Sequence, residues 1–266
     1  MANFTDIKKR LTTGIIFFTI IILSGYWGDS KGFMALFVVL MTLCAYEWAK
    51  LCNLNSIWSK IYSFVFLLFV LIIMQYSMLY PVIKPILILI LPLLIIIHLM
   101  FNNIRIGLVT GIAYLSVATL SVFYSFSAIT KVWWYPIATI WITVICVDIS
   151  AYIVGRIVGG KKLAPKVSPG KTVSGFFGGV LFGSFVFTYL VTGQDYNFFV
   201  FLVGIVLSTM AQIGDLYQSF MKRRIGVKDS GSILPGHGGI FDRVDGLIMV
   251  LVFIPILILI YYSFGV

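Results

Sequence analysis

Residues 132–156 have the sequence VWWYPIATIWITVICVDISAYIVGR, a long apolar run with one acidic residue, Asp148, inside it. A helix that crosses a bilayer core needs about 20 mainly apolar residues. Similar runs recur along the 266-residue chain, in which 61% of residues are hydrophobic and 11% are charged. Soluble domains have roughly 45–50% apolar and about 25% charged residues, so the composition excludes a soluble globule, and its hydrophobicity excludes a disordered chain. The sequence predicts a polytopic membrane protein.

The apolar runs predict an all-α fold, because they do not alternate in polarity as the strands of a membrane barrel do. We expect about nine transmembrane helices and two long, basic, Gly-rich loops, at residues 156–171 and 222–243. The expected spans cover residues 11–26, 32–49, 61–75, 82–101, 107–129, 132–154, 175–191, 198–216 and 246–264.

The positive charges predict the orientation of these spans. With nine spans, 16 of the 19 Lys and Arg residues fall on the side of the N-terminus and three on the other. Lys and Arg are enriched in cytoplasmic loops, so we expect a cytoplasmic N-terminus, an external C-terminus and both long loops in the cytoplasm. The same rule explains the net charge of +10, which therefore does not indicate a nucleic-acid partner.

The two parts of the chain differ in polar content. We expect residues 1–130 to form an N-terminal transmembrane scaffold of about five helices, and residues 131–266 to form a catalytic transmembrane domain of about four. Both long loops belong to the second part, as do six of the nine acidic residues, five of which gather on the side of these loops. Those five are Asp148, Asp215, Asp229, Asp242 and Asp245.

Asp148 lies deep in an expected span. An acidic side chain at the centre of a membrane helix costs about 2.5–3.5 kcal/mol on insertion scales, and such residues usually line a functional cavity. The alternative is a structural ion pair with Lys or Arg on a neighbouring helix.

Asp215, Ser219 and either Lys222 or Arg223 follow one another at steps of three and four residues, which places them on one helix face. A carboxylate, a hydroxyl and cations at the end of a span suit a phosphate ligand bound with magnesium. The alternative is a cluster of interfacial charges that extend toward water.

The segment KDSGSILPGHGGIFDRVDG, residues 228–246, is rich in glycine around His237. Glycine allows the backbone to approach a phosphate closely. Asp242 and Asp245 follow three residues apart at the start of the last span and can face one cation. Taken singly, each can instead be a helix cap.

The other loop contains Gly170-Lys171-Thr172, but a P-loop requires glycine where this chain has Pro165, and we expect no strand before it. Its lysines predict a site for a polyanion or, alternatively, an ordinary basic cytoplasmic loop.

The run SFMKRRIGVKDSGSILPGHGGIFDRVD, residues 219–245, resembles the signature of the membrane-bound phosphatidate cytidylyltransferase family. That signature is S-x-x-K-R, four residues, K-D, and then P-x-H-G-G-x-x-D-R-x-D, and all twelve fixed positions are met. The likeness extends upstream to about residue 145, with one departure: Ser174 stands where many relatives have Glu.

The resemblance implies that CTP and phosphatidate react to CDP-diacylglycerol and pyrophosphate for phospholipid biosynthesis. It also implies magnesium, as one or two cations, an active site at the cytoplasmic face of the inner membrane, and a homodimer. The catalytic residues expected are Lys222, Arg223, Lys228, Asp229, His237 and Arg243. The residues expected to bind substrate or nucleotide are Asp148, Lys171, Thr172, Ser219, Gly238 and Gly239, and the metal ligands expected are Asp215, Asp242 and Asp245.

Two alternatives remain at this point. A related CTP-dependent enzyme, either an isoprenoid-lipid cytidylyltransferase or a polyprenol kinase, would keep a nucleotide site, since a shared fold does not fix function. An ion-coupled transporter would use Asp148 as its ion site.

Overall fold

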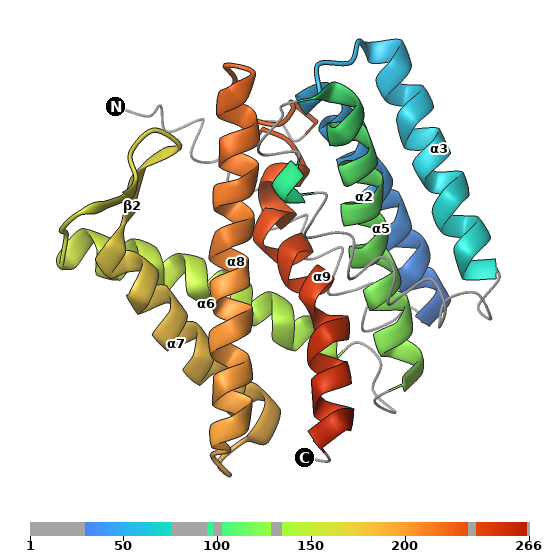
Figure 1. Cartoon of the computed structure of the whole chain (residues 1–266). Coiled ribbons are helices and arrows are strands. Elements are labelled where there is room, and N and C mark those ends of the chain that lie inside the picture. The colour runs from blue at the N-terminus through green and yellow to red at the C-terminus, as the bar shows by residue number, and fades with distance from the viewer. Residues whose placement is uncertain (1–29, 76–94, 98–102, 129–134, 234–237, 265–266) are drawn as a thin grey trace, which may run out of the picture. The chain divides into compact units, whose positions relative to one another are not determined.

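The computed structural model describes residues 30–75, 95–97, 103–128, 135–233 and 238–264 (Figure 1). Its main elements are α2 (Ser30–Leu51), α3 (Ser56–Gln75), α5 (Ile104–Ala128), α6 (Tyr135–Ile157), β1 (Lys162–Ala164), β2 (Ser168–Thr172), α7 (Val173–Thr192), α8 (Phe198–Arg224) and α9 (Phe241–Phe264).

Within the described residues, six helices are long and apolar enough to cross a membrane. They are α2, α3, α5, α6, α7 and α8, and each coincides with an expected span. The multi-pass, helical membrane class is thereby confirmed. The expected span at 11–26 and almost all of that at 82–101 lie outside the described residues, so the number nine stays a prediction.

The chain divides into two compact units, and α9 passes from one to the other after Val244. The first unit comprises residues 1–134 and 227–244, and the second comprises residues 135–226 and 245–266. The expected division into a scaffold and a catalytic domain at residue 130 is a functional one and stays a prediction.

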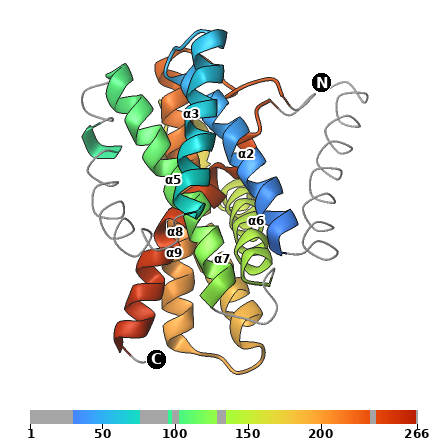
Figure 2. The same ribbon diagram turned by 90° about the vertical axis from the view of Figure 1, so that its right-hand side faces the viewer.

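In the first unit, α2, α3 and α5 pack side by side (Figures 1 and 2). Trp48 of α2 packs against Tyr114 of α5 with the rings tilted and their centroids 5.8 Å apart, and its Nε1 donates to the carbonyl of Gly107 at 2.9 Å. Tyr62 of α3 donates to the carbonyl of Leu108 at 2.7 Å. Buried aromatic rings therefore fill the core, while carbonyl oxygens in the first turns of α5 accept from their polar atoms.

In the second unit, α6 packs on α7, and α7 on α8. Gly175, Gly179 and Gly183 form a stripe along α7 at intervals of one turn. A methyl group on any of them would collide with Ala151 or Val147 of α6 or with their carbonyl oxygens. Small residues let membrane helices approach closely, and this stripe fixes the α6–α7 contact.

The basic loop after α6 forms an antiparallel hairpin, with Lys162 opposite Thr172 and Ala164 opposite Ser168. Strand β2 ends where α7 begins, and Thr172 caps that helix by accepting from the amide of Gly175 at 3.1 Å. Our expectation that no strand precedes Gly170-Lys171-Thr172 is therefore wrong. Only strands with open edges are excluded from lipid, and a loop between spans is free to form a hairpin. The P-loop remains excluded by Pro165.

Candidate functional site

Two glycines bring Asp215 and Asp245 close together in the second unit. A Cβ on Gly214 of α8 would lie 2.7 Å from both the carbonyl oxygen of Asp245 and Cβ of Met249. A Cβ on Gly246 of α9 would lie 3.1 Å from the carbonyl oxygen of Ala211. The two helices thus cross at glycines, and the acidic residue beside each glycine is held at the crossing.

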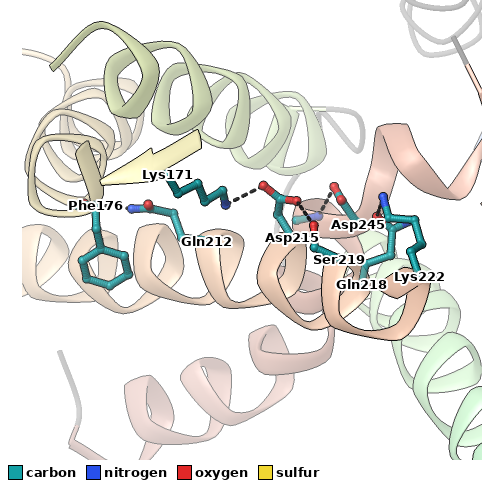
Figure 3. Close-up of polar contacts among 9 residues, drawn as sticks. Lys171, Phe176, Gln212, Asp215, Gln218, Ser219, Lys222 and Asp245 are labelled. Atoms are coloured by element: carbon teal, nitrogen blue, oxygen red, sulfur yellow. Dashed lines mark hydrogen bonds and ion pairs between the residues drawn. The ribbon is translucent and has the colours of Figure 1, made fainter. Parts of the chain in front are cut away.

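Asp215 is engaged by two side chains (Figure 3). Lys171 Nζ, from the end of β2, lies 2.5 Å from Asp215 Oδ2, and Ser219 Oγ donates to Asp215 Oδ1 at 3.3 Å. The side chains of Lys171 and Asp215 are 24% and 30% exposed, so a ligand from solvent can reach both. The predicted grouping of Asp215 with Ser219 is confirmed, and the hairpin adds Lys171 to it.

Lys222 of α8 and Asp245 of α9 extend this group. Asp245 Oδ1 accepts from the amide of Gly246 at 2.8 Å. The charges of Asp215, Asp148 and Lys222 all act on Asp245, and those of Asp215 and Lys171 act on Asp148. We call Asp148, Asp215, Asp245, Lys171 and Lys222 the charged cluster. It combines oxygen ligands for a cation with ammonium groups for an anion, which are the two requirements of a metal-bound polyphosphate.

Gln218 belongs to the same helix face and was missed by the sequence analysis. Lys222 Nζ donates to Gln218 Oε1 at 3.2 Å, which fixes the orientation of the amide. Gln218 is 1% exposed, and its Nε2 has no hydrogen-bond partner within the described residues (Figure 3). Buried donors are nearly always satisfied, so this amide indicates a missing acceptor. Gln218 lies three residues after Asp215 and four before Lys222, and this spacing could have placed it on the same helix face.

The signature segment, which we define as residues 228–242, belongs to the first unit. Asp242 Oδ2 accepts from the amide of Ser230 at 2.8 Å and from that of Gly239 at 3.0 Å. Gly238 has φ +82°, and a Cβ there would lie 3.0 Å from both Asp229 Cβ and Asp242 Oδ2. A left-handed backbone and this close approach explain why the signature requires glycine at 238.

The other predicted residues are spread over both units. Lys228, Asp229 and Arg243 are exposed on the first unit. Arg223 is exposed on the second, where its Nε donates to the carbonyl of Val167 at 3.3 Å. Thr172 is buried and caps α7, which is a structural role, while a contact with nucleotide stays a prediction for it. His237 lies outside the described residues.

Glu47 is a second residue that the sequence analysis missed. It lies near the end of α2, is fully buried, and accepts hydrogen bonds from Ser230, Ile240 and Phe241. The rule that singled out Asp148, an acid within an apolar run, applies equally to Glu47.

The donor set suits magnesium. Within the described parts of the chain, no three His, Cys, Asp or Glu side chains converge to form a metal cage. Magnesium seldom uses such a cage, because it is commonly held by one or two carboxylates together with substrate phosphates and water. Asp215 and Asp245 provide carboxylates of this kind beside the lysines that a phosphate needs.

Comparison with known proteins identifies the family. The cytidylyltransferase family model matches residues 8–261. The chain belongs to the cytidylyltransferase family. Relatives named phosphatidate cytidylyltransferase share 44% identity over 128 residues (Staphylococcus haemolyticus), 47% over 123 (Staphylococcus epidermidis) and 42% over 128 (Staphylococcus aureus). These matches cover 45–47% of this chain and 46–48% of each relative, so the chain spans about half the length of the curated relatives it matches.

Proposed function

We propose that this protein transfers the cytidylyl group of CTP to phosphatidate, releasing pyrophosphate and forming CDP-diacylglycerol. The observation that carries this proposal is the charged cluster, in which Lys171 pairs with Asp215 at 2.5 Å beside Asp245. Family membership, the complete signature and the names of the relatives support the choice of substrates.

The reaction requires positioning and charge neutralisation more than proton transfer. A phosphate monoester is largely dianionic near neutral pH. A non-bridging oxygen of the lipid phosphate attacks the α-phosphorus of CTP, and the bond from that phosphorus to the oxygen shared with the β-phosphate breaks. Pyrophosphate then leaves with the electron pair of that bond. Because the nucleophile is already an anion, catalysis comes from alignment and from stabilising the spreading charge.

The lysines of the charged cluster supply part of that stabilisation. Lys171 is paired with Asp215, and an incoming phosphate competes with Asp215 for its ammonium group. Lys222 is buried and is oriented by Gln218, so its position is fixed before the substrate arrives. Ammonium groups held in place in this way stabilise transition-state charge without reorganisation.

Magnesium completes the charge balance when it is bound. We assign Asp215 and Asp245 as its protein ligands, with the nucleotide phosphates as the others. Asp242 is a further candidate carboxylate, and the orientation of its side chain is set by the amides of Ser230 and Gly239.

The remaining roles follow from charge and backbone shape. Glycines at 238 and 239 let the backbone approach phosphate, and Ser219 and Thr172 offer hydroxyl groups. The cationic and polar side chains proposed to contact the triphosphate or the lipid phosphate are those of Arg223, Lys228, His237 and Arg243. Asp148 is assigned to the nucleotide, and Asp229 is proposed as a further catalytic residue.

The excess of Lys and Arg on one side of the expected topology supports a cytoplasmic active site in the inner membrane, where CTP is available. A homodimer is proposed from the family resemblance alone.

The proposal is tested with purified protein in detergent, magnesium and radiolabelled CTP, supplied with either phosphatidate or a polyprenol phosphate. We expect label in the lipid phase and an equal amount of pyrophosphate with phosphatidate only. Label transferred only to the isoprenoid lipid would identify a sister enzyme. No label in lipid across several divalent cations and both lipids would overturn the proposal.

A further inference from the structure

Glu47 lies where helix α2 meets the end of the signature segment in the first unit. Its Oε1 accepts from the amide of Ile240 at 3.1 Å. Its Oε2 accepts from the amide of Phe241 at 2.9 Å and from Ser230 Oγ at 2.8 Å. The side chain is fully buried, so these three donors replace water.

Phe241 is the first residue of α9, and Ile240 directly precedes it. The first amides of a helix have no partner within it, and a negative charge there is favoured by the helix dipole. Glu47 therefore caps α9 from another helix. Three hydrogen bonds from this part of the chain to one buried side chain hold the turn in place.

Two glycines of the signature segment are required by the presence of Glu47. A Cβ on Gly239 would collide with Ser230 Oγ and Glu47 Oε2, and one on Gly231 would collide with Glu47 Oε1. The neighbouring Trp48 packs edge-on against Phe241 at a ring distance of 5.6 Å. The end of α2 thus contacts residues at both ends of the segment from 230 to 241.

The residues held by Glu47 are those that orient Asp242. Ser230 donates its hydroxyl to Glu47 and its amide to Asp242 Oδ2. Gly239 donates its amide to the same oxygen of Asp242 and precedes the two amides bound by Glu47. Any movement of this backbone changes where the carboxylate of Asp242 points.

We propose that Glu47 is a positioning residue that fixes the backbone at Ser230 and Gly239–Phe241 and thereby sets the orientation of Asp242 for the reaction. The consequence for catalysis rests on the proposed function, whereas the backbone anchoring does not. Glu47 acts through the signature segment and contacts no reacting atom.

The test compares E47Q with Y62F in the 266-residue protein. Gln is nearly isosteric with Glu, but each oxygen of Glu47 accepts from a backbone amide, so the NH₂ group of Gln has to face one of these amides and at least one of the three hydrogen bonds is lost. Y62F removes a buried hydrogen bond of the same unit, from Tyr62 to the carbonyl of Leu108, without touching the signature segment. Both variants lose a buried interaction, but only E47Q weakens the hydrogen bonds that hold the backbone at Ser230, Ile240 and Phe241.

Two measurements are made on each variant, normalised to folded protein. Hydrogen exchange read by mass spectrometry follows peptides that cover residues 228–245, and kinetics give kcat and the concentrations of magnesium and CTP at half-maximal rate. For E47Q we expect faster exchange in these peptides, at least tenfold, and a loss of about 10–100-fold in activity, as is found when groups that orient a ligand are removed. A rise in the half-saturating magnesium or CTP concentration is expected with it. Y62F should lower the unfolding temperature. Its hydrogen exchange at residues 228–245 and its half-saturating magnesium and CTP concentrations should stay within twofold of those of the unsubstituted protein.

A second variant keeps the test valid if E47Q folds poorly. S230A removes the hydroxyl that donates to Glu47 and keeps the hydrogen bond from the amide of residue 230 to Asp242. Exchange, activity and half-saturating concentrations should therefore change in the same direction as in E47Q, by a smaller factor. In the double variant with E47Q, the effect of S230A should be smaller than in S230A alone, because both substitutions disrupt the same hydrogen bond, between Ser230 and Glu47.

The outcomes separate the two proposals. Unchanged exchange at residues 228–245 in both E47Q and S230A would overturn the anchoring role, whatever the activity. Faster exchange with unchanged kcat and half-saturation would overturn the link to catalysis. If the parent protein fails to label phosphatidate, the proposed function fails, and hydrogen exchange still decides whether Glu47 anchors the segment.

Discussion

The charged cluster and the signature segment both contain aspartates, but their side chains are engaged in different ways. In the charged cluster, Asp215 and Lys171 pair with each other while remaining about a quarter to a third exposed, and the buried Nε2 of Gln218 lacks an acceptor. In the signature segment, Asp242 binds two backbone amides and the buried Glu47 has three donors. The first arrangement can exchange partners with a ligand, whereas the second holds a backbone conformation. This difference indicates which substitutions should affect binding and which should affect the shape of the loop.

The largest effect is expected from D215N. The change removes the charge that pairs with Lys171 and the proposed cation ligand, so activity should fall by about 10²–10³-fold, as when a preorganised electrostatic group is lost. The initial rate of label transfer to phosphatidate measures it. D195N, an exposed Asp in the turn between α7 and α8, is the matched control and should stay within twofold. Equal activity of D215N and D195N would show that the charged cluster does not contribute to catalysis.

The signature segment is tested next by G239A. The added methyl group collides with Ser230 Oγ and with Glu47, and it has to displace one of them. We expect a loss of about 10–100-fold in activity with faster hydrogen exchange in residues 228–245. G170A is the control, since a Cβ at Gly170 meets nothing within 4 Å. Near-normal activity and exchange in G239A would show that this backbone tolerates movement.

A smaller effect is expected from Q218M. The substitution removes a buried donor that has no partner in the described chain and also the amide oxygen that accepts from Lys222, so the free energy of unfolding should fall by a moderate amount, about 1–3 kcal/mol. Half-saturating CTP should also rise about tenfold, roughly the loss of one good hydrogen bond to a charged group. Thermal unfolding and CTP titration measure the two quantities. Strong destabilisation without a change in CTP dependence would assign Gln218 to packing.

The smallest effect concerns Cys52, a buried residue of the first unit. Burial raises the pKa of Cys52 to about 12, so its thiol stays protonated, and thus unreactive, at pH 8. Maleimide labelling located by mass spectrometry should find Cys52 unmodified in folded protein and modified after unfolding in denaturant. Rapid labelling of folded protein at Cys52 would show that this part of the unit opens readily.

Much of the fold follows from composition and spacing. Apolar runs of about 20 residues identified six helices that the structure describes, because a bilayer imposes both length and polarity on a spanning segment. The hairpin at Lys162–Thr172 was not predicted, since its strands are short and lie in a polar loop whose pairing depends on geometry rather than on hydrophobic pattern. The pairing of Asp215 with Ser219 was predicted, because both lie on one helix and its period is fixed.

Composition, residue spacing and helical periodicity were enough to predict the membrane class, the twelve-residue signature and the helical faces that carry Asp215 and Lys222. These are local properties, because they depend on periodicity and on residues close together in the chain. The folded arrangement was needed to show that Lys171 reaches Asp215, 44 residues away in the chain, and that Glu47 holds a segment more than 180 residues away. Contacts of this kind depend on helix crossings at glycines such as Gly214 and on the close packing of α2 against the loop, and no periodicity in the chain encodes which helices will meet.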